Sequence, residues 1–396
     1  MNPAPLLSVV IPTRNRLPTL AIVVEQLLSW CADELEVVVE DNSDDPGDFA
    51  PIQRRHSANP RLSYQYHSGR RSAVENCDAA VARARGQVMI MIGDDDSITR
   101  HCIQAAKWMV ENEIDALVCH VGSYTWPDME HAVGVNNAYN GKLVRLNVSG
   151  VTHQLDIDAE LMRLARSGAQ KLGSMPRVYQ SLVQRRIVER LRETVGTCFP
   201  GPVPDMANAV SMSKFINCCY YTDIPLIISG QSKNSMSGRN SVRKHQGEIA
   251  KEKSLPDAAA ANWDRRVPRY WSAPTIWAEA AIKGAEATRQ GFFIEEFSFA
   301  KVYANCLVFN DVKYYPEVAR AVGQGGGSVL ALVPQVVWFV GVKTVERAFA
   351  LIKKLVAGVP GDSFENVAEA AKHLEAVIEE RGFVKRLLQV RVGQSE

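Results

Sequence analysis

Three consecutive aspartates, Asp94, Asp95 and Asp96, follow an apolar run that reads MIMIG. Carboxylates grouped in this way are typical ligands of Mg²⁺ or Mn²⁺, because these hard cations take oxygen atoms and are commonly held by one or two carboxylates together with substrate phosphates. A second interpretation is a polar turn in which the aspartates end a strand and cap the next helix. A Gly-Asp-Asp triplet also occurs in template-directed polymerases. The triplet alone leaves these interpretations open.

The overall composition is that of an ordinary folded protein. Of 396 residues, 46% are hydrophobic and 22% are charged, and both fractions are typical of globular domains. The 45 Lys and Arg residues against 44 Asp and Glu leave a net charge of +1. This balance provides no general attraction for nucleic acid, which argues against a polymerase. The length favours one large domain with a smaller one, or two domains.

The cysteine pattern and the N-terminal sequence favour a cytoplasmic location. The eight cysteines are scattered, without a CxxC pair or a histidine at zinc-finger spacing, so neither a zinc module nor a disulfide framework is expected. The start, MNPAPLLSVVIP, lacks a basic segment followed by a long apolar core and predicts a first strand rather than a signal peptide. The uncharged segment 328–342 is shorter than a membrane-spanning helix and contains Pro334, so we expect a buried core helix.

Strand and helix patterns alternate over the first 120 residues, and these elements position the aspartates. An apolar stripe from Leu20 to Leu28 at helical spacing predicts an amphipathic helix. Ser72 with Glu75 three residues later is the pattern of a capping box that opens another helix. Alternating strands and helices predict a mostly parallel sheet with helices on both faces. We expect strands at residues 8–11, 36–40, 62–66, 88–92 and 116–121.

Polar clusters follow three of these predicted strands where each strand ends. In open α/β sheets, ligands bind in the crevice beyond the carboxyl ends of the strands. We therefore expect the three clusters to converge on one site. They consist of Pro12, Thr13, Arg14 and Asn15, of Asp41, Asn42 and Ser43, and of Asp94, Asp95 and Asp96.

The order of these motifs resembles the N-terminal half of family 2 glycosyltransferases of the GT-A fold. The matching strings are SVVIPTRNR, EVVVEDNS and GRRSAVENCDAAVARARGQVMIMIGDDDSI. Each motif is short, whereas their order and spacing together are fairly specific. The resemblance covers roughly residues 6 to 125 and continues more loosely to about residue 245. It implies a Rossmann-like α/β domain that binds a nucleotide sugar.

The resemblance also implies which residues bind the donor, a nucleotide diphosphate sugar. Asp41 would accept a hydrogen bond from the nucleobase, although a turn-forming cap is the alternative for this residue. Arg70 and Arg71 would face the nucleotide or the diphosphate, and a solvated basic pair is the alternative for them. The remaining donor-binding residues implied by the resemblance are Pro12, Thr13, Arg14, Asn15, Asn42, Ser43, Asp94 and Asp95.

A divalent cation, Mn²⁺ or Mg²⁺, is implied as the cofactor. It would bridge the two phosphates and neutralise the charge that develops on the leaving nucleotide. Gly93 stands where the family commonly has Asp, so the register of the motif is ambiguous by one residue. Asp94 and Asp96 are assigned as the metal ligands, with Asp95 as the alternative. We expect their replacement by Ala to abolish transfer and to leave the fold intact, because it removes like charges from a crowded turn.

An inverting transfer also needs a general base that takes the proton from the acceptor hydroxyl. In this family a carboxylate from the second half of the chain supplies it. The string CFPGPVPDMANAVSM places Asp205 at the start of a predicted helix. An N-cap for that helix is the alternative role. Asp128, Glu130 and Asp223 are the further candidates.

Beyond residue 250 the pattern becomes helical. Alanine-rich and aromatic stretches lead into long helical patterns, one of them from Ser363 to Arg381. We therefore divide the chain into a GT-A domain, residues 1–245, and a mainly helical C-terminal region, residues 246–396, that shapes the acceptor site or mediates homo-oligomerisation. The basic amphipathic segment GFVKRLLQVRV favours either a packed helix or peripheral contact with the inner face of an anionic membrane.

The resemblance thus implies a metal-dependent glycosyltransferase of the hexosyl- or deoxyhexosyl-transferase class. It would move a sugar with inversion from a nucleotide diphosphate sugar to a glycan or lipid-linked acceptor, in bacterial-type glycan or polysaccharide synthesis, without a nucleic acid partner. One alternative is a nucleotidyltransferase or polymerase-type enzyme that uses the aspartate triplet. Another is a non-catalytic nucleotide-sugar-binding protein, in which Asp205 only caps its helix.

Overall fold

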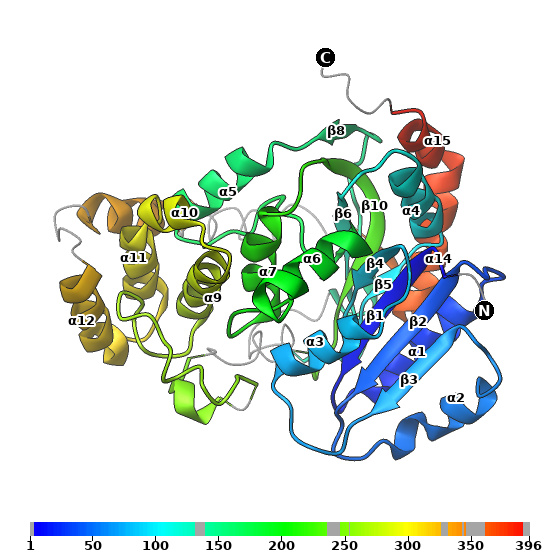
Figure 1. Cartoon of the computed structure of the whole chain (residues 1–396), viewed down its shortest axis with the longest axis horizontal. Helices are drawn as coiled ribbons and strands as arrows, with labels where there is room; N and C mark the ends of the chain where they lie inside the picture. Colours follow the sequence, from blue (N-terminus) through cyan, green and yellow to red (C-terminus); the bar gives the residue numbers. More distant parts are fainter. Residues whose placement is uncertain are drawn as a thin grey trace.

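The structure is a computed structural model of the chain and describes residues 4–130, 139–235, 246–252, 254–325, 332–342, 344–345 and 361–390. A twisted sheet runs through the centre of the molecule, with helices on both of its faces and a separate group of helices at one end (Figure 1). The α/β fold class and the mainly helical C-terminal region expected from the sequence are confirmed.

The first part of the sheet is parallel, as the alternating pattern predicts. β1 lies between β2 and β4, and β3 pairs with the outer edge of β2. Helices connect these strands, and the predicted apolar stripe of α1 is buried from Leu20 to Leu28. The elements are β1 (Leu7–Thr13), α1 (Leu17–Ser29), β2 (Leu35–Asp41), α2 (Ala50–Arg55), β3 (Leu62–Tyr66), α3 (Ala73–Ala82) and β4 (Val88–Met91).

The second part of the sheet is mixed, and the sequence did not predict this. β9 (Ser181–Gln184) lies antiparallel between β4 and β6 (Ala116–Thr125), although it follows β6 in the chain. The long strand β10 (Cys219–Gln231) runs parallel to β6 with a register shift between Thr222 and Ile227. Short strands complete this part of the sheet: β5 (Ser97–Ile98), β7 (Lys142–Val144), β8 (Thr152–Gln154) and β11 (Gly361–Ser363).

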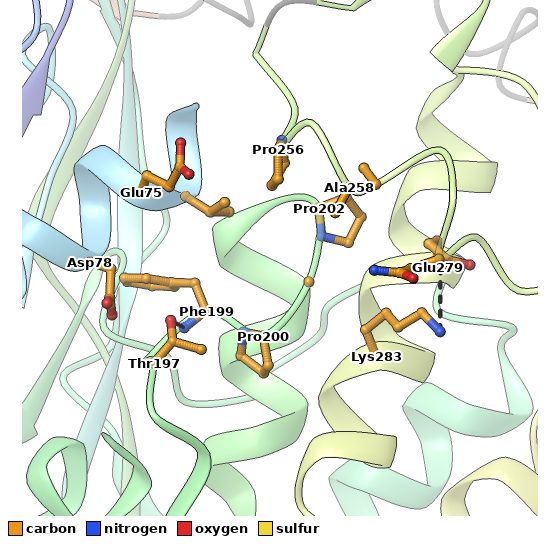
Figure 2. Close-up of a pocket in the computed structure, with 14 residues that line it drawn as sticks. Glu75, Asp78, Thr197, Phe199, Pro200, Pro202, Pro256, Ala258, Glu279 and Lys283 are labelled. Atoms are coloured by element: carbon orange, nitrogen blue, oxygen red, sulfur yellow. Dashed lines mark hydrogen bonds and ion pairs between the residues drawn. The ribbon is translucent and has the colours of Figure 1, made fainter. Parts of the chain in front are cut away.

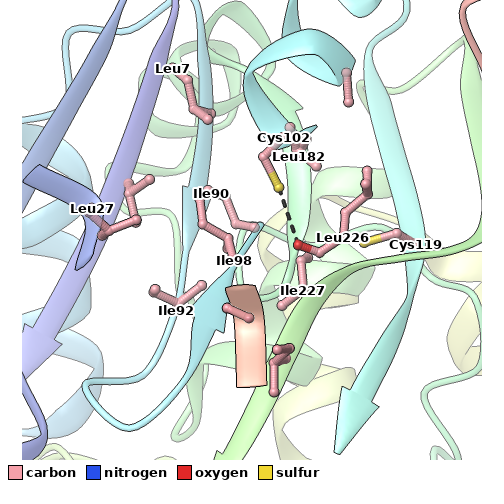
Figure 3. Close-up of a cluster of buried hydrophobic side chains, with 14 of the residues drawn as sticks. Leu7, Leu27, Ile90, Ile92, Ile98, Cys102, Cys119, Leu182, Leu226 and Ile227 are labelled. Atoms are coloured by element: carbon pink, nitrogen blue, oxygen red, sulfur yellow. Dashed lines mark hydrogen bonds between the residues drawn. The ribbon is translucent and has the colours of Figure 1, made fainter. Parts of the chain in front are cut away.

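Alternate residues of the strands pack into two cores on opposite faces of the sheet. On one face, side chains of α1, α4 (His101–Glu111), α14 (Val367–Glu380) and α15 (Phe383–Leu388) share one core with Leu7, Val9 and Ile11 of β1. Figure 3 shows part of this core, where the Cys102 thiol donates a hydrogen bond to the Leu226 carbonyl across 3.5 Å. On the other face, α3 and α6 (Arg185–Val195) cover Val10 and Val38.

A third core lies among helices away from the sheet, on the left of Figure 1. Side chains from these helices bury one another, among them Tyr270, Phe293 and Tyr303. The strands contribute no side chain to this cluster of buried residues. Its helices are α5 (Ile157–Arg166), α7 (Pro204–Ser213), α9 (Ala273–Ala287), α10 (Gly291–Glu295), α11 (Phe299–Phe309) and α12 (Tyr315–Gly325).

The C-terminal region therefore packs in two places. α9 to α12 belong to the separate core, whereas α14 returns to the sheet and contacts α1, beside which it lies in Figure 1. α14 begins at Val367, after the short strand β11, so the predicted helix from Ser363 starts four residues later than expected. Asn366 caps it by accepting a hydrogen bond from the Glu369 amide at 3.0 Å. The domain boundary at residue 245 stays a prediction.

Two expectations about apolar segments have different outcomes. Of the segment 328–342, residues 328–331 lie outside the described residues. Residues 332–342 form a helix, but Val337 and Trp338 are 66% and 52% exposed, so the prediction of a buried core helix is wrong for this part. Phe383 and Leu387 of α15 are buried in the core on the sheet, as in a packed helix. No helix in the described ranges combines the length and apolar character that crossing a bilayer requires.

Candidate active site

Direct contacts bring the three polar clusters to one edge of the sheet. The Thr13 hydroxyl, at the end of β1, donates to Oδ2 of Asp94 beyond β4. The Asn15 amide donates to the Ser43 hydroxyl beyond β2 at 2.8 Å. Asn15 has a φ of +57°, a left-handed conformation that asparagine tolerates better than most residues. The parallel order of β4, β1 and β2 therefore delivers all three clusters to the same place, as expected.

Asp41 is fully buried at the end of β2, and both of its carboxylate oxygens accept hydrogen bonds. Oδ1 accepts from the Ser43 amide at 2.8 Å, and Oδ2 accepts from the Tyr64 hydroxyl at 2.8 Å. The first contact is the turn-forming bond that sequence reasoning considered for this residue. Burial, together with the bond to Asp41, raises the pKa of Tyr64. These two bonds leave one acceptor site of each Asp41 oxygen unused.

Asn42 and the two arginines fix the segment that leads into α3. The Asn42 side chain donates to the His67 carbonyl at 2.9 Å and accepts from the Arg71 amide at 2.9 Å. The Arg71 guanidinium pairs with Glu40 at 2.5 Å, and Glu40 is only 2% exposed. Arg70 lies 3.3 Å from the exposed Asp257. Both arginines thus have carboxylate partners in this structure, and their contact with a donor stays a prediction.

Asp96 is the most completely hydrogen-bonded carboxylate of the triplet. Its Oδ2 accepts from the Gly93 amide at 2.9 Å, the Tyr179 hydroxyl at 2.8 Å and the Gln180 amide group at 3.0 Å. Its Oδ1 accepts from the Gly230 amide of β10 at 2.8 Å. Burial and the neighbouring Asp95 raise the pKa of Asp96 to about 6. Tyr179, Gln180 and Gly230 were not predicted from the sequence.

Asp94 and Asp95 share a contact with Arg16. The Asp95 Oδ2 accepts from the amide and hydroxyl of Ser232, at 3.0 and 2.7 Å. Arg16 Nε lies 3.0 Å from Asp94 Oδ1, and Arg16 Nη1 lies 3.4 Å from Asp95 Oδ1. Burial raises the pKa of Asp94 to about 7, although the Arg16 charge opposes this shift. The string PTRNR contains Arg16, but nothing in the sequence indicates that its partner lies 78 residues away.

The donor set fits a divalent cation that arrives with phosphates. Asp94 Oδ1 is buried without a hydrogen bond, since Arg16 Nε is close but not aligned as a donor. Among the described residues, Asp96 Oδ1 accepts one hydrogen bond, from the Gly230 amide. Both are hard oxygen atoms of the kind that Mg²⁺ and Mn²⁺ take. Within the described ranges, no three His, Cys, Asp or Glu side chains are arranged to hold a metal ion by themselves. Ligand oxygens would have to complete the coordination.

Asp205 lies in the first turn of α7, and its carboxylate makes none of the hydrogen bonds or ion pairs found among the described residues. Val203 is the N-cap residue of this helix, so Asp205 does not have the capping role. Burial raises the pKa of Asp205, and the charge of Arg177 opposes the shift. Asp205 and Asp96 both raise the pKa of Tyr179, after burial as the main cause. Asp205 is therefore within electrostatic reach of the triplet.

The three further candidates for the base have other surroundings. Asp223 accepts hydrogen bonds from Ser149 and Gly150 at 2.7 to 2.8 Å. These bonds lower its pKa although partial burial opposes them. Glu130 pairs with Lys233 at 2.6 Å on the surface, and Asp128 is exposed. These surroundings differ from the partly buried position of Asp205, which has no such partner among the described residues.

A cavity of about 410 Å³ is lined in part by residues 197–202, the loop that precedes α7 and Asp205. Its wall consists of the α3 side chains Glu75 and Asp78, the loop 197–202, the segment around Pro256 and the α9 residues Glu279 and Lys283 (Figure 2). Glu279 is 2% exposed, and its Oε1 lies 3.8 Å from Lys283 Nζ. None of the residues that sequence reasoning assigned to the site lines this cavity.

Residues 8–146 match the family model described as glycosyl transferase family 2, which confirms the resemblance over this segment. No curated protein matches the chain. Among solved structures, S. aureus TarS 1-349 in complex with UDP-GlcNAc is 14% identical, with 99% of this chain and 94% of that chain covered and a TM-score of 0.49. Mannosyltransferase PcManGT from Pyrobaculum calidifontis, in complex with GDP-Man and Mn²⁺, is 15% identical, with 98% and 88% covered and a TM-score of 0.40. Neither similarity defines a substrate for this chain.

Proposed function

With a glycosyl transferase family 2 segment at residues 8–146 as the premise, we propose that this chain transfers a hexosyl or deoxyhexosyl group from a nucleotide diphosphate sugar to an acceptor hydroxyl. The transfer is metal-dependent and inverts the sugar carbon. It serves glycan or polysaccharide synthesis, with a glycan or lipid-linked acceptor. The supporting observation is the buried triplet Asp94 to Asp96, which shares one sheet edge with Thr13 and Asp41.

The nucleoside part of the donor lies over the ends of β1 and β2. Asp41 accepts a hydrogen bond from the base through the lone pairs that Ser43 and Tyr64 leave free. Thr13, Arg14 and Asn15 line the base and ribose from the neighbouring loop. Reciprocal bonds between Asn15 and Asp44, at 2.8 and 2.9 Å, hold this loop before the ligand arrives. Such preorganisation lowers the entropy lost on binding.

The diphosphate lies beside the triplet, where Asp94 and Asp96 would hold the cation. When bound, Mn²⁺ or Mg²⁺ neutralises the charge that develops on the leaving nucleoside diphosphate. The four donors around Asp96 keep its carboxylate in one orientation, which fixes where Oδ1 points. Two carboxylate oxygens, together with phosphate oxygens and water molecules, would provide the octahedral oxygen coordination that these cations usually take.

Asp205 takes the proton from the acceptor hydroxyl. Its carboxylate has no partner among the described groups, so its oxygens are available to a substrate. Burial raises its pKa, which makes the carboxylate a stronger base than a solvated aspartate, and the Arg177 charge opposes this shift. The helical region beyond residue 245 contributes to the acceptor site or to self-association.

Calorimetric titration with uridine and guanosine diphosphates tests this function. We expect binding with Mn²⁺ and much weaker binding in the presence of a chelator, because the phosphates would otherwise meet uncompensated aspartates. Asp94→Ala should abolish the Mn²⁺-dependent part of the affinity. Equal affinity with and without Mn²⁺ would contradict the metal role. Absence of binding for both nucleotides would contradict the donor site. A screen of nucleotide sugars by thermal shift then identifies the donor through the stability that bound ligand adds.

A further inference from the structure

The Arg16 side chain lies against two carboxylates of the triplet, and one of them, Asp94, is a proposed ligand of the cation. Arg16 Nε lies 3.0 Å from Asp94 Oδ1, the buried carboxylate oxygen without a hydrogen bond, and Nη1 lies 3.4 Å from Asp95 Oδ1. The Asp94 side chain is fully buried, whereas 20% of the Arg16 side chain is exposed. The guanidinium therefore lies between these carboxylates and the solvent.

The backbone of the loop directs Arg16 toward this position. Asn15 is held at φ +57° by bonds from its backbone and side chain to Ser43 and Asp44. This left-handed residue turns the chain between two arginines, so Arg14 faces outward to Asp44 at 3.0 Å and Arg16 faces inward to Asp94. The placement of Arg16 thus follows from the loop and not from the free rotation of a surface side chain.

The guanidinium and a divalent cation at Asp94 Oδ1 would oppose each other, because both carry positive charge. A metal ion on Asp94 Oδ1 would stand within a few ångströms of the Arg16 charge, and two cations so close repel each other strongly where water is excluded. Arginine is also a favoured partner of phosphate, since its planar fork bonds two oxygens at once. A diphosphate that enters with the metal therefore offers Arg16 a replacement for the carboxylates it gives up.

We propose that Arg16 is an exchangeable counter-ion of the Asp94 and Asp95 pair, a role that rests on the donor site proposed above. In the ligand-free chain it lies against Asp94 Oδ1, one of the two proposed ligand atoms, and opposes the binding of free metal. When a nucleoside diphosphate and a divalent cation enter together, Arg16 moves from the carboxylates to the diphosphate. Arg16 is thus a positioning residue that couples metal binding to nucleotide binding, so each ligand strengthens the binding of the other.

Manganese titration of Arg16→Gln tests this coupling, with free Mn²⁺ followed by its paramagnetic resonance signal. Without nucleotide, the variant should bind Mn²⁺ about tenfold more tightly than the wild-type chain, and the gain in Mn²⁺ affinity on adding uridine or guanosine diphosphate should shrink by a similar factor. Arg16→Lys keeps the charge but loses the planar fork. Its Mn²⁺ affinity, and the gain in that affinity on adding nucleotide, should lie between those of the wild-type chain and Arg16→Gln. This second variant also serves if the glutamine variant is poorly folded, which circular dichroism reports.

Arg100→Gln is the matched control. Arg100 also bridges two carboxylates, Glu375 at 3.6 Å and Glu379 at 2.7 Å, but these belong to α14, outside the proposed site. Its replacement should leave Mn²⁺ affinity unchanged.

Two negative outcomes are distinguishable. If the wild-type chain binds Mn²⁺ with nucleotide, but neither Arg16 variant binds free Mn²⁺ more tightly, the counter-ion role is overturned and the proposed function stands. If the wild-type chain binds no Mn²⁺ even with either nucleotide, the metal-dependent function fails, and the counter-ion role fails with it.

Discussion

Replacement of Asp96 by Ala separates the structural role of the triplet from its role in binding. The Asp96 carboxylate accepts hydrogen bonds from Gly93, Tyr179, Gln180 and Gly230. Asp94, in contrast, accepts a hydrogen bond only from Thr13 among the described groups and pairs with Arg16. We therefore expect Asp96→Ala to destabilise the fold, although the sequence alone suggested that removal of a charge from this turn would be harmless.

The loss of folding free energy in Asp96→Ala can be worked out from the donors that lose their acceptor. A buried donor left without a partner costs about 1–3 kcal/mol, so four such donors at about 2 kcal/mol each cost about 8 kcal/mol of folding free energy. This cost exceeds the stability that is gained by removing the buried charge. That gain is roughly 3 kcal/mol at neutral pH, because burial raises the pKa of Asp96 from 3.8 to about 6. The net loss is about 5 kcal/mol, which corresponds to a fall in melting temperature of about 6 °C for a chain of this length.

Thermal unfolding followed by circular dichroism measures this loss, with Asp94→Ala as the matched control. The control also removes a buried carboxylate from the triplet but leaves a single hydroxyl without its acceptor, so its melting temperature should be unchanged or higher. Both variants should lose Mn²⁺-dependent nucleotide binding. If Asp96→Ala melts at or above the wild-type temperature, the four hydrogen bonds do not hold the site together and the reasoning is refuted.

Three further predictions address the base, the nucleoside site and the cavity. Asp205→Asn should lower turnover about 10²-fold or more, because the amide cannot take a proton, and calorimetry should show unchanged donor affinity. Turnover at the wild-type rate would remove Asp205 from the mechanism. Asp41→Ala should weaken nucleoside diphosphate binding about tenfold and leave free Mn²⁺ affinity unchanged, and a parallel loss of both would show that the nucleoside and metal sites are not separate. Burial raises the pKa of Glu279 from 4.5 to about 7, so its contribution to stability is complete below pH 4.5 and is lost as the pH rises through 7, by up to roughly 3 kcal/mol. Glu279→Gln should remove this pH dependence, as urea unfolding at pH 5 and pH 8 would report, and equal pH dependence in both chains would contradict it.

Local patterns were sufficient to predict the first half of the sheet. The apolar runs of β1 and β2 and the helical spacing of apolar residues in α1 each indicate one element type. The parallel pairing of β1 and β2 follows because a helix connects them. β9 could not be placed in this way, because its antiparallel position between β4 and β6 depends on partners far away in the chain. The exposed helix at residues 332–342 shows a similar limit, since an apolar segment does not itself indicate what covers it.

The candidate site could likewise be predicted from the sequence only in part. The residue types at the strand ends predicted which groups lie at the edge of the sheet, since parallel strands end together. Their partners could not be predicted, because Arg16, Tyr179 and Ser232 reach the triplet only through the tertiary fold. These partners decide which carboxylate oxygens are free for a ligand. The roles of Asp94, Asp96 and Asp205 in binding and catalysis remain predictions for the experiments above.

Gly230 has a consequence for the order in which this site forms during synthesis. Its amide donates to Asp96, and a side chain at this position would lie only 1.7 Å from the Asp95 carbonyl oxygen, so β10 closes over the triplet where only glycine fits. The aspartates leave the ribosome more than 130 residues before Gly230 does. Until then the nascent chain carries three acidic side chains that lack this covering strand. A fragment that ends at residue 146 would contain the whole family segment and still lack an organised site.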